Sequence, residues 1–204
     1  MNAQPKQSKL ALIMILVVFA AFFVVGRFVI DPTSLPRLNH GTLLIPHLHV
    51  DTLDWRDTDG MPYTADDMSG QWSMLYVADG SCDSACKNGL YYLIRQLRLS
   101  LDRDINRVRR IVLHTAEANE ELRAFLDDNV AGMLELHGDA DRLNAALTEI
   151  PDHPENAQGK IFLVSPDGMI FIWYPSHADM ENTLEEADRI RADLKRTLKG
   201  SLIG

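Results

Sequence analysis

Residues 72–86, WSMLYVADGSCDSAC, decide the fold of this chain. Residues 72–78 are a short apolar run between Gly70 and Gly80, a length and boundary that predict a buried central strand. After the run, apolar residues recur at helical spacing and predict an amphipathic helix that ends near Ser100: Leu90, Leu93, Ile94 and Leu97. The stretch therefore places two cysteines where a core strand passes into a helix N-terminus, the usual location of a site in α/β folds.

The rest of the sequence continues this alternation of strands and helices. We predict extended segments or strands at 43–45, 47–50, 72–78, 110–114, 132–137, 160–165 and 169–174. We predict helices at 118–127 and 140–150 and a last helix from about Ser176, with Ser176 as its cap and Asp179 completing a box-like start; residues 54–70 read as a loop. The turn Pro166-Asp167-Gly168 joins the last two strands as a hairpin. The order predicts an α/β, thioredoxin-like domain with a central, mostly parallel sheet flanked by helices and an antiparallel edge.

The first thirty residues differ sharply from the rest. Residues 10–30 supply 21 residues with Arg27 as their only charge, and crossing a membrane takes about 20. A cleaved signal peptide is the alternative, but its apolar stretch is normally only about 7–15 residues long. Lys6 and Lys9 precede the span and favour a cytoplasmic N-terminus. We expect residues 1–9 as a cytoplasmic tail, 10–30 as a transmembrane anchor, 31–41 as a linker, and 42–200 as a domain facing the periplasm from a bacterial inner membrane.

Charge excludes several classes of partner. The chain of 204 residues has a formal net charge of −9. Residues 1–30 hold three cations and no acid, so residues 31–204 carry 17 basic and 29 acidic groups, a net charge of −12. Such a domain repels nucleic acid and anionic lipid surfaces. No glycine-rich nucleotide loop and no hydrolase nucleophile elbow stands between a strand and a helix.

Cys82 and Cys86 are the only cysteines, and they lie four positions apart. Positions i and i+4 share one face of a helix, so the two sulfurs can approach each other. The helix N-terminus and Lys87 favour the thiolate form, whereas Asp83 opposes it. Such a pair can act as a redox couple or as two soft ligands for a metal such as Cu(I). The alternative is a structural disulfide, although a ring of five residues restrains little chain.

The segment strand–Gly–Cys-x-x-x-Cys–helix, followed late in the chain by the Pro166-Asp167-Gly168 hairpin, resembles the Sco/SenC family of membrane-anchored copper chaperones over roughly residues 42–198. The resemblance implies a thioredoxin-like domain behind one N-terminal helix that assists copper-centre assembly in cytochrome c oxidase. It also implies that Cys82 and Cys86 are the copper-binding and redox-active cysteines.

Two positions depart from the pattern of that family. Lys87 follows the second cysteine where the family usually has proline. The family's metal-binding histidine follows an aspartate; Asp152-His153 offers that pair, but His153 lies thirteen residues before Pro166, about four more than is usual in the family. Either a short insertion keeps His153 as the third ligand, or that ligand is missing.

The remaining histidines and arginines favour plainer interpretations. We expect His114 and His137, at strand ends, to be core-edge residues with satisfied ring nitrogens, and His40 and His177 to be loop or cap residues; His47 and His49 alternate onto one face and are a weak surface metal candidate. One basic stretch is expected to be a solvated face, with docking of an acidic partner as the alternative: Arg95, Arg98, Arg103, Arg107, Arg109 and Arg110.

Three functions follow for this sequence. The leading expectation is a Sco-like assembly factor that handles Cu(I), or the client thiols that receive it, through Cys82, Cys86 and His153, with a cytochrome c oxidase subunit or another assembly factor as partner. The second is a metal-free, membrane-tethered thiol–disulfide oxidoreductase. The third is a non-catalytic assembly scaffold.

Overall fold

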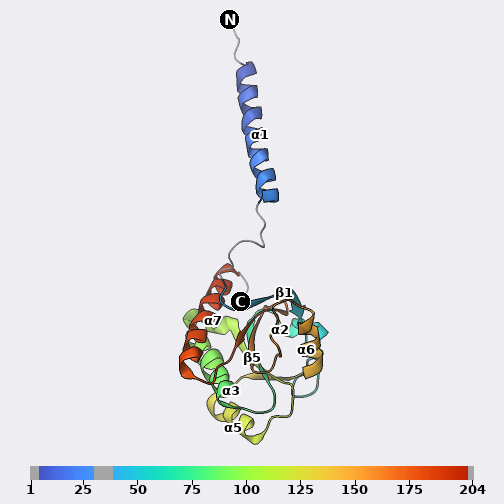
Figure 1. Ribbon diagram of the computed structural model, residues 1–204, viewed down its shortest axis with the longest axis vertical. Coiled ribbons are helices and arrows are strands. Elements are labelled where there is room, and N and C mark those ends of the chain that lie inside the picture. Colours follow the sequence, from blue (N-terminus) through green and yellow to red (C-terminus); the bar gives the residue numbers. More distant parts are fainter. Residues whose placement is uncertain (1–4, 30–38, 202–204) are drawn as a thin grey trace. The chain divides into compact units, whose positions relative to one another are not determined.

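The computed structural model describes residues 5–29 and 39–201, and the chain divides into two compact units, Met1–Leu38 and Asn39–Gly204 (Figure 1). The first unit contains one helix, α1 (Pro5–Val29). Within it, Lys9–Gly26 is long and apolar enough to cross a membrane, with a mean hydropathy of 2.7. Residues 1–4 of the predicted tail, residue 30 of the predicted anchor and residues 31–38 of the predicted linker lie outside the described residues.

The second unit is a six-stranded sheet with helices on both faces. Its strands are β1 (Thr42–His49), β2 (Trp72–Ala78), β3 (Val108–His114), β4 (Leu134–His137), β5 (Lys160–Val164) and β6 (Met169–Pro175). Its α-helices are α2 (Ala65–Met68), α3 (Ser84–Asn88), α4 (Leu97–Leu99), α5 (Glu120–Asn129), α6 (Ala140–Thr148) and α7 (Met180–Gly200). A π-helical segment, η3 (Gly89–Gln96), joins α3 to α4, and two 3-10 segments are η2 (Val50–Thr52) and η4 (Asp102–Arg107).

The sheet is mixed, with strand order β1-β6-β5-β2-β3-β4. The pairings β2–β3 and β3–β4 are parallel, whereas β2–β5, β5–β6 and β1–β6 are antiparallel. The prediction of a mostly parallel sheet therefore holds for three neighbouring strands only. The predicted antiparallel edge is also corrected, because the β5–β6 hairpin lies inside the sheet and β1 covers its outer side.

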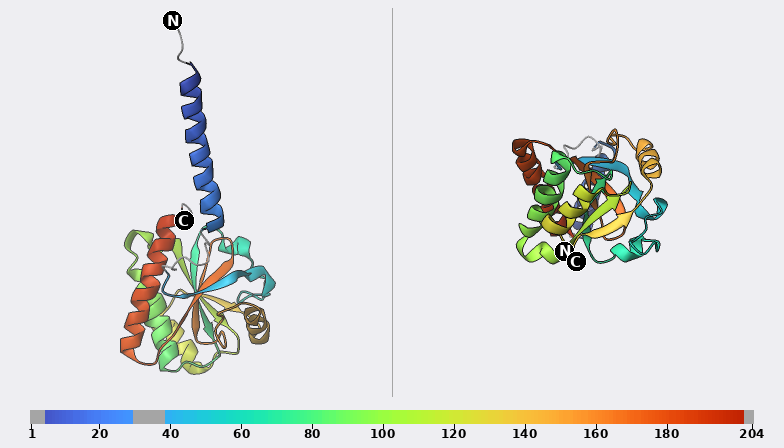
Figure 2. Two further views of the ribbon diagram at one scale, coloured as in Figure 1. Left: turned by 45° about the horizontal axis from the view of Figure 1, so that its top comes forward. Right: turned by 90° about the horizontal axis from the view of Figure 1, so that it is seen from below.

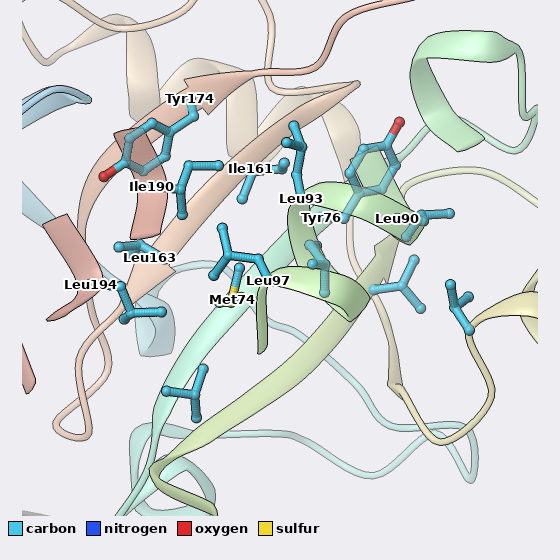
Figure 3. Packing of buried hydrophobic residues seen from close by; sticks show 14 of the residues in the cluster. Met74, Tyr76, Leu90, Leu93, Leu97, Ile161, Leu163, Tyr174, Ile190 and Leu194 are labelled. Carbon is cyan, nitrogen blue, oxygen red and sulfur yellow. The ribbon is translucent and has the colours of Figure 1, made fainter. Parts of the chain in front are cut away.

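Side chains of each strand alternate between two cores. On β2, Met74 and Tyr76 belong to one buried cluster and Leu75 and Val77 to the other. The first cluster lies under η3, α4, α5 and α7, and the second under η2, α2 and α6, so the sheet separates two groups of helices (Figure 2). Figure 3 shows the first core, where residues of η3, α4 and α7 pack on β2 and β5.

Several predicted bounds shift for identifiable reasons. The last helix starts at Met180, not near Ser176, because Asp179 is its N-cap and accepts a hydrogen bond from the Asn182 amide at 2.9 Å, whereas the Ser176 hydroxyl donates to the Gly159 carbonyl. The loop predicted at 54–70 contains α2, whose start is held by a capping box on Thr64.

Candidate functional site

The cysteines lie where β2 passes into α3. After Ala78, the Asp79 carboxylate accepts hydrogen bonds from the amide and hydroxyl of Ser81, both at 2.9 Å, and so shapes the connecting turn. Asp83 is the N-cap of α3, and its Oδ1 accepts from the Cys86 amide at 2.9 Å. The predicted position at a strand-to-helix junction is therefore confirmed, and a capping aspartate separates the two cysteines.

The two cysteines form a disulfide. Cys82 and Cys86 are bonded across a Cα–Cα distance of 5.0 Å. Cys86 lies in α3, whereas Cys82 comes directly before the N-cap Asp83, so the disulfide joins the turn to the helix. No other cysteine exists in the chain. The pair can therefore store two electrons by opening to a dithiol, and it is the only group of this kind in the protein.

Both sulfurs lie below the surface in this oxidised state. Cys82 is 2% exposed and Cys86 is 4% exposed, and both belong to the core that lies under η3, α4, α5 and α7. The intervening Asp83 and Ser84 are exposed. A partner thiolate therefore meets little exposed surface of the disulfide in this state.

The charges around the pair are closer to balance than the sequence suggests. Lys87 was expected to favour thiolate, but its Nζ pairs with a carboxylate oxygen of Glu121 on α5 at 2.6 Å. Both side chains of this ion pair are largely exposed, so solvent screens it. Asp83 lies between the cysteines and disfavours a second negative charge. The helix N-terminus remains the main local feature that stabilises a thiolate.

A second group of residues packs beside the start of η3. Burial raises the pKa of Tyr76, a hydrogen bond with Ser176 opposes this, and the charges of Asp83 and Asp79 raise it further, so the phenol stays protonated. Gly89 fits against this tyrosine because a Cβ there would lie 2.9 Å from Tyr76 Cε2. Sequence reasoning missed this group.

Asn88 ties the end of α3 to the segment before α7. Its side-chain amide donates to the carbonyls of His177 and Ala178 at 3.0 and 3.1 Å. The helix bearing Cys86 is thereby fixed to a loop about ninety residues away in sequence. A polar residue at the end of an apolar helix face is the one sequence signal that could have indicated this contact.

His153 is not gathered with the cysteines. Its Nδ1 lies 2.7 Å from the Ile150 carbonyl oxygen, which orients the ring within its own loop. Across residues 5–29 and 39–201, no three His, Cys, Asp or Glu side chains come together as a metal site. The third-ligand role of His153 therefore stays a prediction.

The other histidines divide into buried and exposed positions. His114 is buried, and its Nε2 lies 2.9 Å from Glu135 Oε2, but its Nδ1 has no hydrogen-bond partner in the described part of the chain. His137 stacks on it with ring centroids 5.3 Å apart and is exposed, so it is not a core-edge residue. His114 is buried as predicted, but the expectation of satisfied ring nitrogens is wrong for its Nδ1. His47 and His49 bond to nearby backbone and join no metal-binding group among the described residues.

The fold and the site together define a thioredoxin-like α/β protein whose disulfide lies at a strand-to-helix junction. The chain belongs to the family described as transmembrane-like, thioredoxin-like, C-terminal domain, whose model matches residues 72–201. The matched region runs from β2 to the end of α7 and includes both cysteines.

Solved structures similar to this chain include both copper-binding and thiol-exchange proteins. Copper-bound yeast Sco1 is 18% identical, with 78% of this chain and 95% of that chain covered and a TM-score of 0.48. Copper-bound ScoI of Bradyrhizobium japonicum is 19% identical, with coverage of 76% and 98% and a TM-score of 0.46. The thioredoxin domain of a Bacteroides vulgatus thiol-disulfide oxidoreductase is 17% identical, with coverage of 74% and 98% and a TM-score of 0.43. No curated protein matches the chain by sequence. Similarity this distant carries no conclusion about activity.

Proposed function

We propose that this chain is a membrane-tethered thiol–disulfide protein whose working group is the Cys82–Cys86 pair. The observation that carries the proposal is the disulfide at the capped N-terminus of α3. In the exchange step, a client thiolate attacks one sulfur to form a mixed disulfide, and the other cysteine leaves as a thiolate. A second client thiol then releases the client as a disulfide and leaves Cys82 and Cys86 as thiols. The reverse sequence reduces a client.

A structural role explains the pair less well. The disulfide joins residues only four positions apart. Closing a loop of about five residues is worth about 2 kcal/mol in the chain-entropy model, the low end of the range for disulfides. The domain already has two buried clusters on opposite faces of its sheet. A fold with this core does not depend on such a small staple.

Cu(I) handling is the second candidate. When reduced, the pair presents two soft sulfur ligands at the start of α3, with Cα atoms 5.0 Å apart, and Cu(I) selects such ligands. The resemblance to copper chaperones adds a cytochrome c oxidase subunit or another assembly factor as recipient. His153 as the third ligand belongs to this candidate as a prediction, and no group of three metal-binding side chains is found among the described residues. Exchange is therefore the function that the geometry favours.

The site of action follows from the anchor. The apolar helix α1 has Lys6 and Lys9 at its start, and this charge placement favours a cytoplasmic N-terminus. We infer a single-pass protein of the bacterial inner membrane with its domain in the periplasm, a compartment in which disulfides persist. A cysteine-reactive probe that cannot cross membranes would label a cysteine placed at exposed Glu181 from the periplasmic side only.

The experiment uses the full chain in detergent. Oxidised protein is mixed with a model dithiol, and released thiols are followed in time; in parallel, anaerobic reduced protein is titrated with Cu(I) against a chelator. Variants are Cys82→Ser/Cys86→Ser and His153→Ala, with His40→Ala as the matched control because His40 is exposed. Exchange by the wild type that is absent from Cys82→Ser/Cys86→Ser supports the proposal. One Cu(I) per chain, lost in the double variant and weakened by His153→Ala, supports the copper function. If wild type shows no exchange and takes up no copper, both functions are overturned and the scaffold is left.

A further inference from the structure

A cavity of about 550 Å³ lies at the opposite end of the sheet from the cysteines. It opens at the start of β3, where Val108 pairs with Trp72, whereas the end of β2 that leads to Cys82 pairs with His114. Three arginines are among the residues that line it, Arg98, Arg109 and Arg110, together with Asp67, Met133 and Leu134.

Arg109 forms a fixed wall of this cavity. Its Nε donates to Gln71 Oε1 at 3.1 Å, and its Nη1 donates to the Asp67 carbonyl at 2.8 Å and to the Tyr63 hydroxyl. Burial raises the pKa of Tyr63, while the nearby Arg109 lowers it. Arg109 is therefore engaged with the protein itself and holds the turn before β2 against β3.

Arg98 and Arg110 are different, because within residues 5–29 and 39–201 each donates its hydrogen bonds to backbone carbonyls only. Arg98 Nε donates to the Val108 carbonyl at 2.6 Å, and Arg110 Nη2 donates to the Ala131 carbonyl at 3.0 Å. Among the described residues, neither has a carboxylate within ion-pair distance. Both are half-buried, and burial lowers the pKa of each. The charges of Arg98 and Arg95 lower the pKa of Arg110 further, so these cations repel one another.

The one acid in the cavity lining does not neutralise them. Asp67 is exposed, and its Oδ2 accepts from the amide and hydroxyl of Thr64 at 2.8 and 3.0 Å, as part of the cap of α2. Arg98 and Arg110 therefore present two half-exposed guanidinium groups with no carboxylate paired to them among the described residues, and an anion could pair with both.

We propose that this cavity binds a small molecule carrying a carboxylate or phosphate group, with Arg98 and Arg110 as the groups that recognise it. Guanidinium forks match the paired oxygens of both anions. The volume falls within the range of about 300–1,000 Å³ typical of small-molecule sites. A small anion is favoured over an acidic protein because the domain as a whole repels an extended acidic surface. Met133 and Leu134 offer an apolar wall for the rest of the ligand.

The test measures anion binding to the full chain in detergent. Inorganic phosphate and succinate are titrated by calorimetry at constant ionic strength, with sodium chloride as the reference and a Glu-rich peptide as a separate arm. Arg98→Gln/Arg110→Gln removes the recognising groups, and Arg191→Gln is the control because that arginine is exposed on α7. Arg110→Lys keeps the positive charge but removes the paired N–H donors of the guanidinium, and it is the test variant if the double variant does not fold.

We expect phosphate or succinate to bind wild type and the Arg191→Gln control equally. Binding should weaken at least tenfold in the double variant and measurably in Arg110→Lys. The Cys82→Ser/Cys86→Ser variant should bind as wild type does, since the cavity lies at the other end of the sheet. Binding that survives in the double variant, or chloride that competes as well as phosphate, would overturn the proposal. Binding of the peptide but of neither small anion would overturn the assignment to a small molecule.

Discussion

Asp193 on α7 should be among the residues on which the stability of the domain depends most. The residue is 5% exposed, and its Oδ2 accepts three hydrogen bonds: from the His40 amide at 2.7 Å, the Gly41 amide at 2.9 Å and the Tyr174 hydroxyl at 2.9 Å. Arg196 lies 3.3 Å from the other oxygen. This carboxylate joins the first residues of the domain to its last helix and to β6.

The loss in the free energy of unfolding caused by Asp193→Ala follows from the hydrogen-bond donors that are left without an acceptor. Tyr174 and Gly41 are buried, so their donors would lose a partner without gaining water, whereas exposed His40 can be solvated. Each orphaned donor costs about 1–3 kcal/mol, and we expect a total loss of about 4 kcal/mol in the free energy of unfolding. For a domain of this size that is a fall in Tm of roughly 8–16 °C.

Thermal and chemical unfolding of the full chain in detergent would measure this loss. Asp188→Ala is the matched control, because that aspartate is exposed on the same helix and should change stability by less than about 0.5 kcal/mol. Tyr174→Phe tests the same contact, and the double variant should lose less than the sum of the two single losses. An Asp193→Ala protein within about 1 kcal/mol of wild type would refute the reasoning.

Three further perturbations test other parts of the structure. Burial lowers the pKa of His114, so below about pH 6.5 the unfolded chain binds a proton that the folded protein resists. The free energy of unfolding, measured by chemical denaturation, should therefore fall between pH 7.5 and 5.5, and it should fall less for His114→Gln. An equal fall in the variant would exclude this histidine as the cause. Gly89→Ala brings a Cβ within 2.9 Å of Tyr76 and should destabilise by about 1–3 kcal/mol in the same assay, while Gly200→Ala, with nothing within 4 Å, should not. Asp83→Asn keeps an N-cap but removes a charge beside the cysteines, so the reduced protein should be alkylated faster at pH 7 with little change in Tm; an unchanged or slower rate would contradict the electrostatic argument.

The sequence predicted the parts of the fold that depend on local patterns. The apolar run 72–78 and the helical spacing after Cys86 place β2 and its helix correctly, and Leu90, Leu93 and Leu97 are buried as predicted. The π-helical form of Gly89–Gln96 does not follow from that spacing. The start of β3 at Val108 was placed two residues late, because Arg109 turns a polar group toward Tyr63 where a buried strand would show an apolar side chain.

Long-range pairing was the part that local patterns could not supply. Alternation of strands and helices predicts parallel pairing, but nothing local indicates that β1 pairs with β6 and so encloses the hairpin. β1 itself was predicted as two short segments around Pro46, and an edge strand accommodates that proline within one element. The distance of His153 from the cysteines could not be predicted either, because it depends on how a loop folds and not on residue type.

The pairing of the two cysteines could be predicted from the sequence, but their burial could not. Two lone cysteines four positions apart at a strand-to-helix junction predicted that their sulfurs can approach each other, and the structure contains the disulfide between them. Their burial to 2% and 4% exposure was not foreseen, because the turn Asp79–Asp83 reads as a polar, open loop. The ion pair of Lys87 with Glu121 also escaped prediction, since the two residues lie 34 positions apart.

The reduction potential of Cys82–Cys86 tests the central claim most directly. The full chain is equilibrated in detergent with redox buffers of graded potential, free thiols are trapped by alkylation, and the fraction reduced is fitted; Cys82→Ser/Cys86→Ser gives the background. A working exchange pair should titrate within the range of known exchange proteins, about −120 to −270 mV. A potential below about −300 mV would show a structural disulfide and contradict the account.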